Sequence, residues 1–209
     1  TPWAEVQDKI ESLVIDLGVT SIKSNAFYNC DKLTGVKLGN MTAIEGNEEI
    51  PNKIPNNAFN NSGLQTVTIP DGIKHIGNGA FGYTGLKDVT DLVLPNGLET
   101  IGDNAFVVTM GSGTNEGIGI TSLTIPSSVK SIGANAFSGR RNLAEVTVED
   151  DNEPGTQLIL GDAAFGDSAN SAYATQGSIR DEQNPDLEYS GTIGTKFFLP
   201  EDLEKYFVN

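Results

Sequence analysis

The sequence predicts a repeat solenoid of the α/β type, in which short strands and irregular segments alternate along one elongated core. Two observations lead to this fold class. The dipeptide Ala-Phe recurs six times, and each phenylalanine lies five residues after an aliphatic residue. A short run of alternating apolar and polar residues recurs with it, often ended by proline. The expected structural core consists of the aliphatic and aromatic partners Ile22 and Phe27, Ile54 and Phe59, Ile76 and Phe81, Ile101 and Phe106, Ile132 and Phe137, and Leu160 and Phe165.

The alternating runs predict a parallel sheet of about seven short strands. In Val67-Thr68-Ile69 the two aliphatic residues would face the core, because successive side chains of a strand point to opposite faces. Pro70 cannot donate to a ladder, so the strand should end there. Equivalent runs occupy residues 13–15, 36–38, 92–94, 123–125, 146–148 and 197–199.

The segment after each strand is expected to be irregular and to enter the core repeatedly. Its apolar residues, such as Ile73 and Ile76, recur three residues apart and are too sparse for a long amphipathic helix. The residue before Ala-Phe is Asn25, Asn57, Gly79, Asn104 or Asn135, with Ala163 as the exception. Asparagine and glycine tolerate left-handed backbone, so we expect a tight corner at this position.

Both ends of the chain are predicted to carry short helical caps that shield the open core. Thr1-Pro2 resembles an N-cap followed by proline at the first helical position, and Trp3, Val6 and Ile10 follow at helical spacing. At the other end, Leu203, Tyr206 and Phe207 would lie on one face of a helix.

These patterns divide one predicted domain, residues 1–209, into four parts. The N-terminal cap takes residues 1–12, the repeats take 13–165, a long insertion takes 166–196, and the last strand and C-terminal cap take 197–209. Spacing between successive core phenylalanines varies from 22 residues (Phe59 to Phe81) to 32 (Phe27 to Phe59). The extra residues should form surface loops, which in solenoids often lie on the binding side.

The repeat resembles the BspA-like leucine-rich repeats of bacterial surface proteins. Residues 64–81, 92–106 and 120–137 follow the pattern L-x-x-V-x-I-P-x-x-V-x-x-I-G-x-x-A-F, and Phe27-Tyr28-Asn29-Cys30 carries the cysteine that follows it. The resemblance implies a leucine-rich-repeat, right-handed coil with few helices. It also implies an extracellular location, cell-surface associated or secreted, because family members include adhesins that bind host matrix proteins or mediate aggregation between bacteria.

Composition excludes some classes of partner. The net charge of −15 and the pI near 4.3 oppose binding to nucleic acid, whose phosphates would be repelled. No apolar run is long enough to span a bilayer, so direct membrane insertion of this segment is not expected. The first residues lack the features of a signal peptide, which is therefore expected to lie outside this segment.

The residues that usually carry chemistry are scarce, and we predict neither enzyme activity nor a cofactor. The single cysteine, Cys30, cannot form an intramolecular disulfide and should pack as a small apolar residue. The single histidine, His75, should point to solvent beside Lys74. No nucleophile motif accompanies either residue.

Calcium is the only metal that the sequence suggests, and the suggestion is weak. Glu149, Asp150, Asp151 and Glu153 supply several oxygen ligands on one loop. They lack the alternating order of a calcium-binding loop, so a solvated acidic insertion is the favoured interpretation.

The outer face of the predicted sheet is the candidate binding surface. Residues between two buried strand positions should face outward, namely Val14, Lys37, Thr68, Val93, Thr124, Thr147 and Phe198. The threonines could also reflect β-propensity alone. The favoured hypothesis is an adhesion or protein-interaction module that binds a host or bacterial surface protein or glycan. The alternatives are a structural spacer and a glycan-binding or hydrolytic site built by the insertions near Tyr173 or Tyr189.

Overall fold

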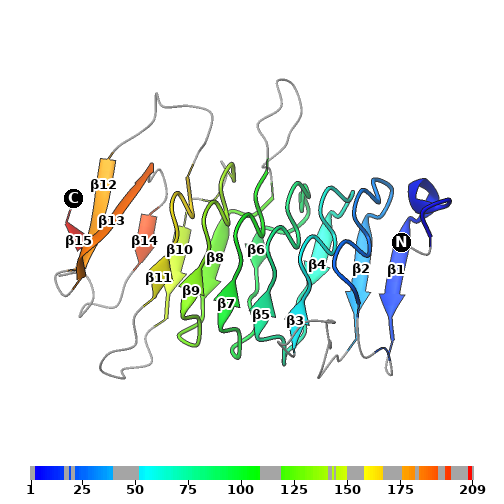
Figure 1. Ribbon diagram of the computed structural model, residues 1–209, viewed down its shortest axis with the longest axis horizontal. Helices are drawn as coiled ribbons and strands as arrows, with labels where there is room; N and C mark the ends of the chain where they lie inside the picture. The colour runs from blue at the N-terminus through cyan, green and yellow to red at the C-terminus, as the bar shows by residue number, and fades with distance from the viewer. Residues whose placement is uncertain are drawn as a thin grey trace.

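The computed structural model of the chain shows a row of stacked coils (Figure 1). It describes residues 3–16, 19, 22–39, 52–108, 119–140, 143, 145–149 and 158–166. It also describes the strands at residues 176–181, 184–192, 196–198 and 207–208, by their backbone alone.

One edge of every coil contributes a strand to a parallel ladder, called here the first ladder. Its strands are β1 (Ser12–Ile15), β2 (Gly35–Leu38), β4 (Thr66–Thr68), β6 (Asp91–Leu92), β8 (Ser122–Ile125), β10 (Glu145–Val148) and β14 (Lys196–Phe198). In β2, Val36 and Leu38 are buried while Lys37 between them is exposed. Each of the seven predicted runs overlaps a strand, and burial alternates with a period of two in β1, β2, β4 and β8.

The first ladder is interrupted between β4 and β6. Val67 comes three positions after Leu64, whereas Leu92 comes six positions after Leu86 at the equivalent place in the next coil. Main-chain hydrogen bonds still connect the two coils up to Asp88, whose N–H donates to the Gln65 carbonyl at 3.2 Å. Beyond that point the extra residues separate the strands, so β1-β2-β4 and β6-β8-β10-β14 form two sheets.

A second parallel ladder runs along the solenoid and was not predicted. It is the five-stranded sheet of β3 (Lys53–Ile54), β5 (His75–Ile76), β7 (Thr100–Ile101), β9 (Ser131–Ile132) and β11 (Ile159–Leu160). The sequence had suggested irregular structure here, and a total of about seven strands is too low for the described chain. A strand of two residues is too short to show an alternating pattern of apolar and polar residues. Only its pairing with strands of the neighbouring coils defines it.

The predicted corner before Ala-Phe is confirmed at the asparagine and glycine positions, and Ala163, the exception to that pattern, adopts it as well. Each of the six residues at this position has a positive φ, between 51° and 63°: Asn25, Asn57, Gly79, Asn104, Asn135 and Ala163. The corner places the following main chain against the neighbouring coil. The N–H of Phe59 donates to the Ala80 carbonyl at 2.8 Å, and the N–H of Phe81 donates to the Ala105 carbonyl at 2.8 Å.

The six phenylalanines form one continuous stack of rings through the coils. Successive centroids from Phe27 to Phe165 lie 5.1 to 5.5 Å apart, and interplanar angles do not exceed 13°. The aliphatic partners are buried beside them, except Leu160, which is only partly buried. A single hydrophobic core therefore connects the described coils.

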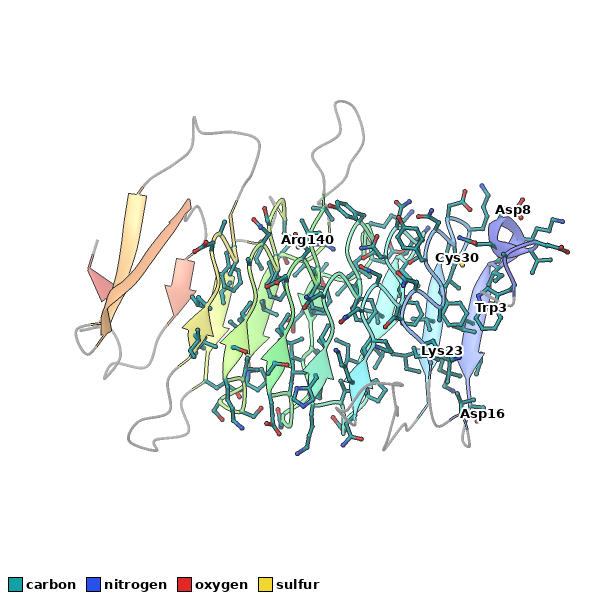
Figure 2. The ribbon with its side chains drawn as sticks, in the orientation of Figure 1. Trp3, Asp8, Asp16, Lys23, Cys30 and Arg140 are labelled. Carbon is teal, nitrogen blue, oxygen red and sulfur yellow. The ribbon has the colours of Figure 1, made fainter. Side chains whose placement is uncertain are left out.

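The N-terminal end is capped, but not by the predicted α-helix. The chain makes a turn over residues 3–6 and then the three-residue 3-10 helix η1 (Gln7–Lys9). Trp3 lies at this end of the row of coils (Figure 2). It stacks on Phe27 with centroids 5.0 Å apart, and its indole N–H donates to the Ala26 carbonyl at 2.6 Å. Val6 is 45% exposed, so the segment lacks the apolar face that would stabilise an isolated short helix.

The predicted C-terminal helix is wrong at Phe207. Phe207–Val208 forms strand β15, which pairs antiparallel with β12 (Gln176–Asp181), and β12 pairs in turn with β13 (Asn184–Thr192). The long insertion therefore contains an antiparallel hairpin rather than loop alone. Leu203 and Tyr206 lie outside the described residues. The division of the chain into a single domain and the handedness of the coil stay predictions.

Candidate functional site

Pairing between strands aligns the predicted surface residues within each of the two sheets of the first ladder. Val14, Lys37 and Thr68 are successive partners in β1, β2 and β4. In the other sheet, Thr124, Thr147 and Phe198 are successive partners in β8, β10 and β14. Because Leu92 pairs with Leu123, Val93 lies level with Thr124. No strand pair among the described residues connects these two groups across the interruption between β4 and β6.

Two apolar side chains stand out on this face. Val14 is 66% exposed and Val93 is 71% exposed, at positions where the strand pattern forces the side chain outward. Lys37, Thr68 and Thr124 are exposed, while Thr147 is partly buried. The face is therefore mixed in character, with apolar positions separated by a lysine and by hydroxyl groups. Phe198 is described by its backbone alone, so its side chain stays a prediction.

A second row of side chains faces outward from the second ladder. Lys53, His75, Thr100, Ser131 and Ile159 are successive partners in β3, β5, β7, β9 and β11. Ile54, Ile76, Ile101, Ile132 and Leu160 follow them and face the core. Sequence reasoning missed this face because it depends on the unpredicted ladder. The residue directly before each inward-facing aliphatic residue should point outward, and this position could have revealed the face from the sequence.

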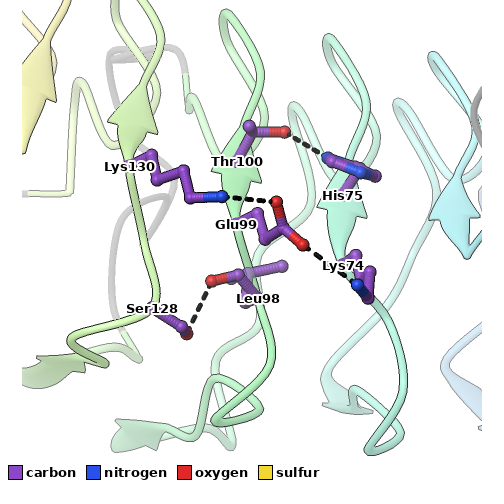
Figure 3. Close-up of polar contacts among 7 residues, drawn as sticks. All are labelled: Lys74, His75, Leu98, Glu99, Thr100, Ser128 and Lys130. Carbon is purple, nitrogen blue, oxygen red and sulfur yellow. Dashed lines mark hydrogen bonds and ion pairs between the residues drawn. The ribbon is translucent and has the colours of Figure 1, made fainter.

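His75 is not simply a solvent-facing side chain. It is partly buried, and its Nδ1 lies 2.9 Å from the hydroxyl oxygen of Thr100 (Figure 3). Burial lowers the pKa of His75 from its ordinary value of 6.5; Glu99 opposes this shift, while nearby lysines add to it. The imidazole is therefore mostly neutral at pH 7 and accepts or donates one hydrogen bond along the row.

An ion-pair network borders the second row. The carboxylate of Glu99 bonds Lys74 at 3.1 Å and Lys130 at 2.9 Å, so it links three successive coils (Figure 3). These hydrogen bonds and the two positive charges lower the pKa of Glu99 to about 2. One carboxylate balances only one of the two ammonium groups, so the network has an excess of positive charge.

A groove runs over the outer face of the second ladder. Its volume is about 420 Å³, and it crosses five coils, with Lys53 and Ile159 at its ends and His75, Thr100 and Ser131 between them. Gly102 and Gly133 contribute only backbone to its wall. A Cβ at Gly102 would lie 2.6 Å from the main-chain nitrogen of Asn78, so close packing of the coils requires glycine there.

Polar side chains that follow the strands of the second ladder, at one side of the groove, connect adjacent coils by hydrogen bonds. The Oδ1 atom of Asn78 accepts a hydrogen bond from the N–H of Asp103 at 3.1 Å. The Oδ1 atom of Asp103 accepts one from the N–H of Ala134 at 2.8 Å. Each bond satisfies a main-chain donor that the corner would otherwise leave unpaired.

Arg140 is a structural residue that the sequence analysis missed. It occupies the position that Cys30, Ser62 and Thr84 take in other coils, three residues after the core phenylalanine. Its side chain is buried, and its guanidinium donates to the carbonyls of Phe106, Gly85 and Thr84, each at 2.9 Å. Burial lowers the pKa of Arg140 to about 10. Aligning the coils by their phenylalanines would have shown the exception.

The remaining candidate residues offer little chemistry. Cys30 is fully buried, and this burial raises the pKa of its thiol. The negative charge of Asp31 raises the pKa further, as the smaller of the two causes. Glu149 is exposed, whereas Asp150, Asp151 and Glu153 lie outside the described residues. Within the described part of the chain, no three or more His, Cys, Asp or Glu side chains gather where they could hold a metal ion. None of its helices could cross a membrane.

Comparison with known proteins agrees with the repeat seen in the structure. A family model described as a BspA type leucine rich repeat region matches residues 5–111, 52–154 and 108–180, with six copies. These overlapping ranges cover most of the 209 residues. Neither a curated protein nor a solved structure matches the chain.

Proposed function

Since the chain belongs to the BspA-type leucine-rich repeat family, we propose that it is a non-catalytic interaction module of a bacterial surface or secreted protein. The family is typically found at the bacterial cell surface, and such repeats are generally not enzymes. The module binds a macromolecular partner through the outer face of the first ladder and the adjoining insertions.

The exposed apolar positions of the first ladder carry this proposal. Val14 and Val93 remain 66% and 71% exposed although the stacking of coils buries most other large aliphatic side chains. Lys37 and Thr68 follow Val14 across one sheet, and Thr124 lies level with Val93 in the other. Burying apolar side chains against a partner stabilises a complex, and the polar neighbours supply the hydrogen bonds that a mixed interface uses.

A binding panel with matched surface variants tests the proposal. Purified extracellular-matrix proteins and bacterial surface proteins are immobilised, and binding of the folded chain is measured by biolayer interferometry. Val93→Asp should weaken the interaction, whereas Ile159→Asp, which places the same charge on the second ladder, should not. Absence of binding across the panel by protein with an intact circular dichroism spectrum contradicts the proposal. Equal loss in both variants contradicts the assignment of the face.

A further inference from the structure

The chain contains two Asn-Gly dipeptides, Asn78-Gly79 and Asn96-Gly97. A glycine after asparagine leaves its main-chain nitrogen accessible to the asparagine side chain, because no Cβ shields it. Both asparagines are exposed in the structure. Exposure therefore does not distinguish the two dipeptides, and their hydrogen bonds decide which of them is free to react.

Asn78-Gly79 is held by the neighbouring coils. The Oδ1 atom of Asn78 accepts the N–H of Asp103 at 3.1 Å, and the N–H of Gly79 donates to the Asp103 carbonyl at 2.8 Å. The N–H of Asn78 donates to the Oδ1 atom of Asn56 at 3.0 Å. Gly79 is also buried, with a φ of 63°. Bringing the Gly79 nitrogen onto the Asn78 side chain would break these bonds.

Asn96-Gly97 has none of these restraints. The two residues are the centre of a turn between β6 and β7, closed by the N–H of Leu98, which donates to the Pro95 carbonyl at 2.9 Å. Among the described residues, neither the Asn96 side chain nor the Gly97 N–H has a hydrogen-bond partner. A Cβ built at Gly97 would meet no atom within 4 Å, so the dipeptide can rotate without displacing a neighbour.

The ends of this turn are fixed while its centre is open to water. Pro95 and Leu98 are buried, and the Leu98 carbonyl accepts a hydrogen bond from the Ser128 hydroxyl at 2.7 Å (Figure 3). Asn96 and Gly97 between them are exposed. Water and hydroxide therefore reach both residues in the folded chain, without any opening of the core.

We propose that Asn96-Gly97 is a site of spontaneous deamidation. The Gly97 nitrogen attacks the side-chain carbonyl carbon of Asn96 and forms a C–N bond. The C–NH₂ bond breaks, and the amide leaves as ammonia, which carries away the proton that the Gly97 nitrogen loses. One water molecule then opens the cyclic imide at either of its two C–N bonds, leaving aspartate or isoaspartate.

The product differs from the parent in charge and in main-chain length. It has a new carboxylate three residues after the exposed Val93 and three residues before Glu99, in a chain whose net charge is already −15. Isoaspartate also adds one carbon to the main-chain path between Pro95 and Leu98. This change is covalent and does not depend on a partner of the first ladder, so either proposal can fail alone.

Incubation of the folded protein in neutral and in mildly alkaline buffer tests the proposal. Peptide mapping by mass spectrometry follows the exchange of NH for O at each asparagine. We expect conversion at Asn96 but not at Asn78, faster in the alkaline buffer because the attacking nitrogen must lose its proton. In concentrated urea the hydrogen bonds of Asn78 are lost, and both sites should convert at similar rates.

Two variants separate the chemistry from the fold. Gly97→Ala should slow conversion of Asn96 about tenfold, because the new Cβ hinders attack by the nitrogen. Gly85→Ala is the matched control, since a Cβ there also meets no atom within 4 Å, and it should change the rate less than about twofold. Circular dichroism of each variant verifies that it is folded.

Three results would overturn the proposal. One is an unchanged Asn96 in the folded protein while both sites convert in urea, which would show that the turn protects it. Another is equal conversion of Asn78 and Asn96 in the folded protein. The third is a rate at Asn96 that Gly97→Ala does not alter.

Discussion

The indole ring of Trp3 lies flat on the ring of Phe27, with centroids 5.0 Å apart and an interplanar angle of 7°. Trp3 therefore extends by one ring the stack that runs from Phe27 to Phe165. In a solenoid the first coil would otherwise expose its core residues at the open end. One side chain thus closes the end of the core with an aromatic contact and a hydrogen bond to Ala26.

Removing this cap should destabilise the protein. We expect Trp3→Ala to lower the free energy of unfolding by about 2 kcal/mol, because burial of apolar surface and aromatic stacking are both lost. Urea denaturation followed by circular dichroism measures the change. Val6→Ala is the control, since Val6 is 45% exposed and should contribute little. Equal stability of Trp3→Ala and the parent would show that the first coil needs no cap.

Arg140 should be essential because its guanidinium bonds three carbonyls from two other coils. Arg140→Met keeps an apolar chain of similar length but leaves buried carbonyls without their donor, so we expect a loss of about 3 kcal/mol. Arg140→Lys should recover only part of it, because one ammonium cannot reach carbonyls that the planar guanidinium bonds together. Thermal unfolding monitored by circular dichroism compares the three proteins. Full recovery by lysine would show that charge alone matters.

The left-handed corners predict a reciprocal pair of variants. Ala163 has a φ of 51° and Asn104 a φ of 55° at equivalent positions. Alanine is strained in this conformation, so Ala163→Gly should raise the free energy of unfolding by about 1 kcal/mol. Asn104→Ala should lower it by about 1 kcal/mol for the same reason. Chemical denaturation measures both, and changes of the same sign in the two variants would refute the explanation.

The single histidine gives a pH dependence with a defined sign. Burial lowers the pKa of His75 below 6.5 in the folded chain, against an ordinary value in the unfolded chain. The unfolded state therefore binds a proton first as the pH falls. Stability is complete above pH 6.5 and decreases from there down through the folded-state pKa. NMR titration of the imidazole measures the pKa directly, and His75→Gln should remove this part of the acid sensitivity. A pKa above 6.5 would be inconsistent with the burial of the ring.

Much of the core could be predicted because its residues recur at fixed spacing in the sequence. The offset between Ile76 and Phe81 recurs wherever the chain returns to the core, and the asparagines before Ala-Phe mark the corners. The second ladder could not be predicted in this way. His75 and Ile76 form a strand only because strands of other coils pair with them. Two residues are too few to show the alternation of apolar and polar residues that predicts a strand.

Other misses arise from departures from the repeat. The N-terminal apolar spacing suggested a helix, yet the contact between Trp3 and Phe27 determines the backbone there. The extra residues between Leu86 and Leu92 interrupt a ladder that the repeat pattern implies is continuous. Arg140 replaces a small residue, and its three carbonyl partners come from segments 34 to 56 residues away. No local pattern encodes such contacts.

The central claim is that one stack of aromatic rings couples the coils into a single cooperative core. Phe81→Ala tests it, because Phe81 is fully buried inside the stack and the single tryptophan, Trp3, lies at its end. Urea unfolding of this variant is followed both by Trp3 fluorescence and by circular dichroism. We expect both midpoints to fall together, with a loss of about 3–5 kcal/mol. An unchanged fluorescence midpoint, with only the circular dichroism transition shifted, would contradict the claim.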